Sequence, residues 1–146
     1  MERAAKRGVH SIQLMVNSYH TSDLRVGQKD LFLSVERLLR QVPTAKVYAT
    51  FGDHAEFLHG KYVVVGGTWA ALGSWNLWTR SAFYELELEA FLESTHAASL
   101  LQAKFDSDRA RNTILVETAD CIPGVRFCPK GCALCRQFGP FFNQSK

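Results

Sequence analysis

The sequence has no apolar run of the roughly 18 residues that a membrane-spanning helix needs, so no such helix is predicted within it. Its opening residues also lack the apolar stretch of a secretory signal, and no targeting segment is predicted from them. Neither sign of charge dominates. The formal net charge of +3 does not require a nucleic-acid partner, and it is equally compatible with an anionic lipid surface.

The composition nevertheless favours a folded domain. The chain has 146 residues, 47% of them hydrophobic, which is enough for one compact core and too few for two. Segments that alternate apolar and polar residues are interleaved with segments of helical periodicity. We therefore predict an α/β domain with a mixed β-sheet flanked by helices. The predicted strands are 9–16, 47–51, 61–66, 70–73 and 86–91, and the predicted helices are 3–7, 30–43 and 97–105.

A histidine and a lysine stand two positions apart, His59 and Lys61, at the start of the predicted strand 61–66. Because side chains alternate along a strand, these two are predicted to lie on the same face. A phosphodiester carries negative charge that repels nucleophiles and grows in the transition state, so its site needs a cation and a neutral nucleophile. An imidazole beside an ammonium group meets both needs.

Small and hydrogen-bonding residues follow after eleven residues: Gly73, Ser74, Trp75 and Asn76. Gly73 allows a close backbone approach, while the Ser74 hydroxyl and the Asn76 amide are donors for a phosphoryl oxygen. Glu87, eleven positions past Asn76, is a candidate to accept the second ring proton of His59 and fix its orientation. These residue types together indicate chemistry on a phosphodiester.

The pattern resembles that of the phospholipase D superfamily, His-x-Lys-x-x-x-x-Asp-x-x-x-x-x-x-Gly-Ser-x-Asn. Each position is in register except the aspartate, where this sequence has Gly66. The following Asn-Leu-x-x-Arg-Ser run, with Glu87 downstream, is similar to that of phospholipase D-type cardiolipin synthases. Glu85 and Glu89 share the alternation of Glu87 and compete with it, and any of the three could simply face water.

The resemblance implies a phospholipase D-like catalytic half-domain over residues 1–110 and a tail over residues 111–146, most like the C-terminal half of a cardiolipin synthase. It implies that His59 is the nucleophile, or the acid/base partner of another motif, in transferring a phosphatidyl group through a phosphohistidine. No metal or organic cofactor is implied. The implied catalytic residues are His59, Lys61, Asn76 and Glu87, and the implied substrate-binding residues are Gly73, Ser74 and Trp75.

The resemblance also implies a second motif, because two His-x-Lys motifs meet in the family's site and this sequence has only the one at His59. The other would come from an N-terminal half or from a second copy of the chain. We favour the first source, since residue 1 falls near the end of the half-domain's first helix, so that its N-terminal strand and most of that helix would be lacking. The implied substrate is an anionic phospholipid similar to phosphatidylglycerol, at a bacterial inner or mitochondrial membrane.

Two rival functions stay open. A homodimeric single-motif endonuclease would bind nucleic acid through a basic groove, with two copies of His59 facing one another. An inactive, truncated phospholipid-binding fragment is favoured by Gly66, which cannot make the hydrogen bonds of a carboxylate.

The tail and the tryptophans give less specific signals. The tail's thiols, Cys121, Cys128, Cys132 and Cys135, match a structural zinc site in number but not in spacing, so reduced, unliganded cysteines are favoured over zinc or disulfides. Its phenylalanines fit a membrane-interfacial segment or a helix packed on the core. Of Trp69, Trp75 and Trp78, the second is expected to border the active cleft.

Overall fold

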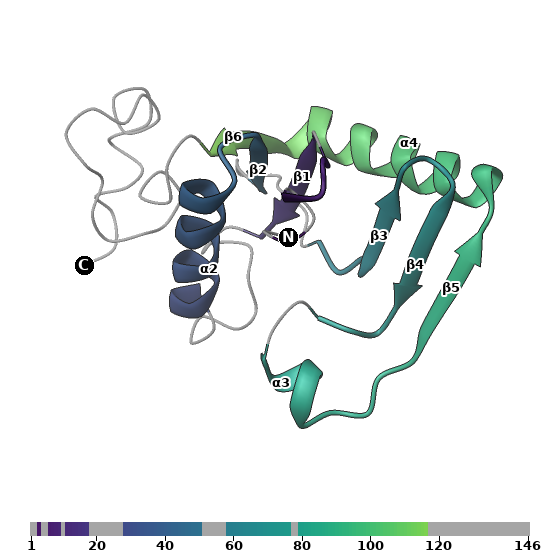
Figure 1. The fold of residues 1–146 in the computed structure, drawn as a ribbon, viewed down its shortest axis with the longest axis horizontal. Helices are drawn as coiled ribbons and strands as arrows, with labels where there is room; N and C mark the ends of the chain where they lie inside the picture. Colours follow the sequence, from purple (N-terminus) through teal and green to yellow (C-terminus); the bar gives the residue numbers. More distant parts are fainter. Residues whose placement is uncertain are drawn as a thin grey trace. The chain divides into compact units, whose positions relative to one another are not determined.

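The computed structural model describes residues 3, 6–9, 11–17, 28–50, 58–76 and 79–116 (Figure 1). The chain divides into two compact units. The first unit is Met1–Leu58 with Asn112–Lys146, and the second is His59–Arg111. The four cysteines, Trp78 and the phenylalanines of the tail lie outside the described residues, so the predictions made for them stay predictions.

The first unit is built on a parallel strand pair joined by a helix. β1 (Ile12–Val16) runs parallel to β2 (Ala45–Thr50), and α2 (Gln28–Gln41) connects them. β6 (Thr113–Val116) pairs with β2 in the antiparallel sense, which gives the mixed sheet order β1-β2-β6. A helical connection is the usual way to join parallel neighbours, because the chain must return to the same end of the sheet.

Apolar periodicity explains the core of this unit. Alternate residues of β2 point inward, so Val47 and Ala49 are fully buried. α2 contributes Val35 and Leu38, which are spaced for one helical face, and both are buried. The remaining buried members of this core are Val16, Val42, Ala45 and Val116, with Ile12, Leu14 and Leu39 packed against them.

The second unit is an antiparallel sheet with one long helix. β3 (Tyr62–Val65), β4 (Trp69–Gly73) and β5 (Glu89–Glu93) pair in that order. A short helix, α3 (Thr79–Phe83), lies between β4 and β5 in the chain, and α4 (Thr95–Asn112) follows β5. Burial raises the pKa of the Tyr62 phenol, and the α4 carboxylates Asp108 and Asp106 raise it further. α4 therefore lies near the sheet face that carries Tyr62.

A glycine turn joins β3 to β4. The Thr68 N–H donates to the Val65 carbonyl over 3.2 Å, while Gly66 and Gly67 have φ values of +60° and +70°. Such angles are costly for residues with a side chain, so glycine suits both positions. Gly66 occupies the position of the superfamily aspartate. It stands five residues beyond Lys61, roughly 16 Å along an extended strand, at the opposite end of β3.

The predicted α/β class is confirmed, while several element boundaries differ from expectation. α4 extends past residue 105 because ion pairs one turn apart, such as Lys104 with Asp108, support a helix where apolar periodicity ends. Its N-cap is Ser94, whose hydroxyl accepts from the Ala97 N–H over 3.2 Å. The strand predicted over 86–91 is instead 89–93. α3 and β6, of five and four residues, are too short to show a period and were not expected.

Candidate active site

His59 and Lys61 lie at the end of the β3–β4 hairpin where β3 begins and β4 ends. The Gly73 N–H donates to the Lys61 carbonyl oxygen over 3.1 Å, which continues the strand pairing to the motif. Lys61 Nζ donates to the His59 carbonyl oxygen over 2.8 Å, so the ammonium group lies beside the backbone of His59. The His59 side chain is exposed. An ammonium group has three donors, so Lys61 can bind a phosphoryl oxygen while it keeps this bond.

Ser74 connects the end of β4 to the segment that carries Glu87. Its N–H donates to the Leu88 carbonyl over 3.0 Å, and its hydroxyl accepts from the Leu88 N–H over 2.9 Å. The same hydroxyl donates its single proton to Glu87 Oε2 over 2.5 Å. In the structure the Ser74 hydroxyl therefore binds Glu87. For Ser74 to bind a phosphoryl oxygen, as the sequence predicts, its hydroxyl proton would have to leave Glu87 for the substrate.

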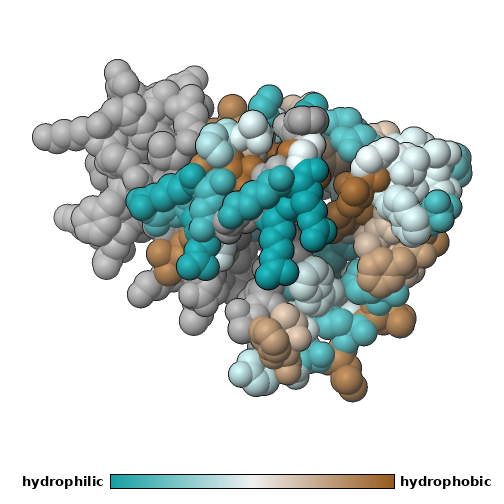
Figure 2. All heavy atoms as spheres, viewed as in Figure 1, coloured by the Kyte–Doolittle hydropathy of each residue, from teal (hydrophilic) through white to brown (hydrophobic). Residues whose placement is uncertain are grey.

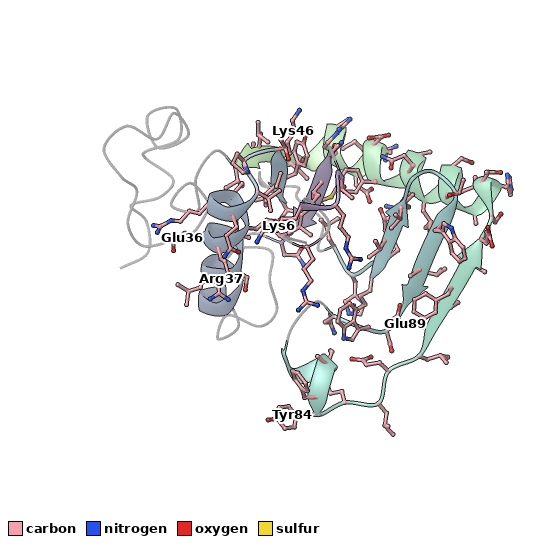
Figure 3. The ribbon with its side chains drawn as sticks, viewed as in Figure 1. Lys6, Glu36, Arg37, Lys46, Tyr84 and Glu89 are labelled. Carbon is pink, nitrogen blue, oxygen red and sulfur yellow. The ribbon has the colours of Figure 1, made fainter. Side chains whose placement is uncertain are left out.

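Each of the three alternating glutamates accepts a hydrogen bond while staying partly exposed. Glu85 accepts from the Ser81 hydroxyl over 2.9 Å. Glu89, labelled in Figure 3, accepts from the Trp75 N–H over 2.7 Å. Glu87 is the one bonded to Ser74, which distinguishes it from its two competitors.

Hydrogen bonds hold Glu87 in its ionised form. The Ser74 hydroxyl makes the largest contribution to lowering the pKa of the Glu87 carboxyl below its ordinary value, followed by Ser81. Smaller contributions come from Glu85 and from the positive charge of Lys61, while desolvation acts in the opposite direction. Lys61 is thus close enough for its charge to act on Glu87. The predicted contact between Glu87 and the His59 ring stays a prediction.

Removing the Ser74 hydroxyl should raise the pKa of Glu87. In the wild type, ionised Glu87 contributes stability that is fully present above its ordinary pKa and is lost as the pH falls through the lowered value. In Ser74→Ala this loss should begin at a higher pH, because the largest stabilising hydrogen bond is gone. NMR titration of the Glu87 carboxyl measures the shift. Ser99→Ala, which removes an exposed hydroxyl bonded only within α4, serves as control and should leave the titration unchanged.

Gly73 is required by space rather than by backbone conformation. A Cβ atom placed there would lie 2.0 Å from the Leu88 carbonyl oxygen and 2.5 Å from Glu89 Oε1. Real Cβ atoms do not approach other atoms so closely, so any larger residue would displace the segment 88–89. The glycine thereby allows the glutamate segment to lie directly against the end of β4.

Sequence reasoning missed the supporting role of two polar residues. Ser81 is buried, with 4% of its surface exposed, and bonds the glutamate segment. The Asn17 side chain donates to the Leu58 carbonyl and accepts from the Leu58 N–H, both over 2.8 Å, which fixes the residue next to His59. Ser81 is the serine of the Asn-Leu-x-x-Arg-Ser run, so a signal for it was present. The Asn17 bonds join positions 41 residues apart, which no local pattern reveals.

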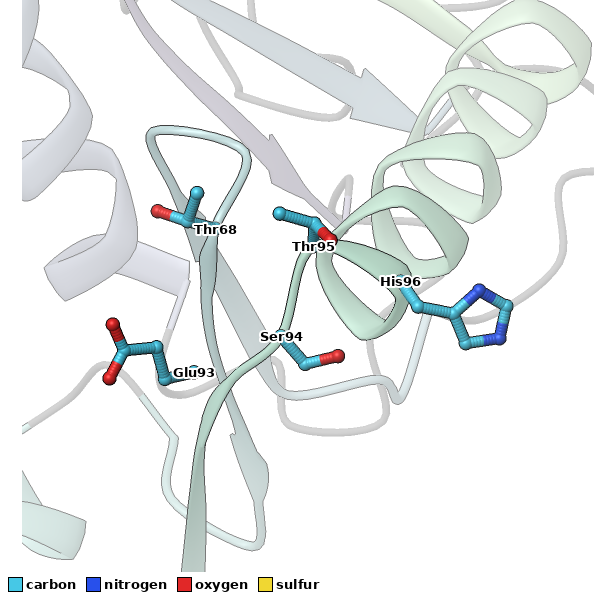
Figure 4. Close-up of a pocket in the computed structure, with 5 residues that line it drawn as sticks. All are labelled: Thr68, Glu93, Ser94, Thr95 and His96. Carbon is cyan, nitrogen blue, oxygen red and sulfur yellow. The ribbon is translucent and has the colours of Figure 1, made fainter.

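The remaining predicted residues follow Ser74 directly. Trp75 is exposed and its N–H is held by Glu89, while Asn76 is half-buried. A separate open pocket, about 350 Å³, lies at the start of α4 (Figure 4). Its lining includes Glu93 and His96, which point in different directions, and Ser94, which caps the helix. Since these groups do not converge, the hairpin end is the better candidate for chemistry.

Within the described part of the chain, no group of three or more His, Cys, Asp or Glu residues is arranged to hold a metal ion. Among the same described residues, no helix is both long enough and apolar enough to cross a membrane. The groups described at the hairpin end are an exposed imidazole, an ammonium group and a hydrogen-bonded carboxylate.

The sequence profile described as "Cardiolipin synthase, PLD-like domain" matches residues 1–109. The chain belongs to this PLD-like family. The match includes the whole span from His59 to Glu87, and it confirms the resemblance to cardiolipin synthases and the α/β fold. No curated protein matches the chain. Membership in the PLD-like family associates the chain with transfer reactions of phosphodiesters, in agreement with the groups gathered around Lys61.

Proposed function

We propose that this chain supplies one half of a phospholipase D-type phosphatidyltransferase site, and that a second His-x-Lys motif supplies the other half. The observation that carries the proposal is the convergence of Lys61 and the Ser74–Glu87 pair at the end of the hairpin where His59 is exposed. Membership in the PLD-like family supports it.

In the proposed reaction a ring nitrogen of His59 attacks the phosphorus of a donor phospholipid, similar to phosphatidylglycerol. A nitrogen–phosphorus bond forms, the bond to the leaving glycerol oxygen breaks, and the second motif's histidine donates a proton to that oxygen. The same histidine then removes a proton from a glycerol hydroxyl of the acceptor phospholipid. The hydroxyl oxygen attacks phosphorus, the nitrogen–phosphorus bond breaks, and neutral His59 is restored.

The other residues act on charge and orientation in this scheme. The Lys61 ammonium neutralises the nonbridging oxygens, whose charge grows as phosphorus becomes five-coordinate, and the Asn76 amide donates to the same oxygens. Glu87 accepts a hydrogen bond from the second ring N–H of His59 and stabilises the positive charge that the ring gains. Because Ser74 keeps Glu87 ionised, the carboxylate is available over a wider range of pH.

The charges near the motif favour a single phosphoryl group over a nucleic-acid chain. Among the described side chains, Lys61 is accompanied by three carboxylates, those of Glu85, Glu87 and Glu89. A nuclease that holds several successive phosphates needs a run of positive charge. The Lys61 ammonium group with these carboxylates nearby suits one phosphodiester in a lipid headgroup better than a run of phosphates.

The decisive experiment compares two substrates and two assemblies. The purified chain, alone and mixed with an N-terminal half that carries a second His-x-Lys motif, is incubated with phosphatidylglycerol vesicles and with single-stranded DNA. We expect cardiolipin, detected by mass spectrometry, only in the mixture. Cleavage of DNA by the chain alone would overturn the proposal in favour of the nuclease. Absence of lipid product in both assemblies would favour an inactive fragment.

A further inference from the structure

The most exposed apolar residues of the second unit are concentrated in one short segment. Among the described large apolar side chains, the four most exposed are Leu86 (103%), Tyr84 (82%), Leu88 (81%) and Phe83 (76%). They lie within residues 83–88, which we call the apolar loop. Monomeric proteins seldom expose large apolar side chains together unless a partner or a membrane covers them when the protein functions.

The apolar loop has the reverse of the usual alternation. In an extended segment at a protein surface, apolar residues normally face the interior and charged residues face water. Here Glu85, Glu87 and Glu89 turn inward to Ser81, Ser74 and the Trp75 N–H, while the intervening leucines face outward. These hydrogen bonds fix the orientation, so the leucines cannot turn inward without breaking them.

The loop projects from its unit. α3 and the segment that follows it lie beyond the ends of β3 and β4, and Tyr84 points away from the ribbon (Figures 1 and 3). Apolar side chains are visible on this part of the surface in Figure 2. Leu86 is as exposed as a residue in an isolated peptide. A protruding set of leucine and aromatic side chains has the composition of segments that insert at a bilayer interface.

The position of the loop distinguishes a bilayer from a protein partner. A complementary motif has to face the side that carries Glu87, since the reacting groups must meet. Leu86 and Leu88 project from the other side of the same segment, so that partner would leave them uncovered. A lipid substrate, in contrast, requires that the bilayer come close to the site.

We propose that the apolar loop inserts its leucine and aromatic side chains into the bilayer interface and so holds the hairpin end at the membrane surface. This inference rests on the proposed function, in which the substrate is a phospholipid. Leu86 and Glu87 are consecutive residues with Cα atoms about 3.8 Å apart, so insertion of one places the other within reach of lipid headgroups. The glutamates of the segment add no attraction for anionic lipids, so apolar contact drives the docking.

Sedimentation with vesicles tests the loop without any need for turnover. The full chain should bind vesicles of phosphatidylcholine, with or without phosphatidylglycerol. Raising the salt concentration to roughly 0.5 M, which screens surface charge, should change the binding little. The double variant Tyr84→Ser/Leu86→Ser should bind roughly tenfold more weakly, because two large apolar groups no longer leave water. Leu100→Ser, which removes an exposed leucine of α4, is the matched control and should bind as the wild type does.

Other results of the vesicle experiment would contradict the proposed role of the apolar loop or separate it from catalysis. Equal binding of the double variant and the wild type, or no binding by the wild type, would overturn the loop's role. A dimer of the wild type that the double variant loses would also overturn it, since the loop would then contact a second copy. His59→Ala should still bind vesicles, which separates docking from chemistry. Turnover of a short-chain, monomeric phosphatidylglycerol by the reconstituted enzyme should be unchanged in the double variant, so its absence in both proteins would count against the proposed function alone.

Discussion

Replacing His59 with alanine should reduce phosphatidyl transfer by the reconstituted enzyme at least about a thousandfold, because alanine cannot form the bond to phosphorus. The loss should appear in turnover and not in folding. His59 is exposed, and the bond that Lys61 makes to this residue uses its backbone carbonyl oxygen, which alanine retains. Cardiolipin formed per unit time, measured on matched amounts of protein, gives the ratio.

The matched control is His96→Ala, which removes an exposed histidine of the same unit at the start of α4. This variant should transfer phosphatidyl groups at the wild-type rate. Equal rates for the His59 and His96 variants would show that no covalent step passes through His59. An acid-labile phosphatidyl group on the wild type, absent from the His59 variant, would identify the intermediate directly.

Gly73→Ala should destabilise the second unit by about 3 kcal/mol or more, a large effect for a single methyl group. The added carbon would overlap the Leu88 carbonyl oxygen, which is backbone and cannot rotate away. Relief of the overlap must move the glutamate segment, which breaks the Ser74–Leu88 bonds and releases Glu87. The free energy of unfolding in denaturant measures the first effect, and a rise in the pKa of Glu87 reports the second.

Gly60→Ala provides the comparison, because it also adds one methyl group beside the motif. Its nearest contact would be 3.2 Å to the edge of the Tyr62 ring, a side chain that can shift. We expect this variant to lose less than about 1 kcal/mol of stability. If the two alanine variants were equally stable, the close packing of Gly73 against residues 88–89 would be wrong.

The sequence predicted best those elements whose period is enforced by burial on one side. In β1 and α2 the apolar residues face a single core, so Val16, Val35 and Leu38 mark the elements clearly. The start of β5 was misplaced because Leu86 and Leu88 alternate as a strand does, while their neighbouring glutamates take the inward positions. Alternation reports an extended chain, and it does not reveal which set of side chains is inside.

The residues of the candidate site could likewise be predicted from the sequence only in part. Residue type and spacing single out His59, Lys61 and Ser74 as candidates, because these groups suit the chemistry of a phosphodiester. The partners of those groups could not be selected. Ser74 can donate to a substrate or to a carboxylate with equal ease, and only the folded chain shows it bonded to Glu87. The clamp on Leu58 by Asn17 depends on tertiary structure alone.

The two-glycine turn between β3 and β4 bears on how such chains should be classified. Its shape is maintained by backbone angles and by one main-chain hydrogen bond, and it stands a full strand length from Lys61. In the proposed reaction, a carboxylate at that corner would be remote from the His59 ring and Lys61, so its replacement by Gly66 would remove no group that contacts phosphorus. If the proposal holds, a missing aspartate alone does not identify an inactive homologue, and the groups at the other end of the hairpin are the ones to inspect.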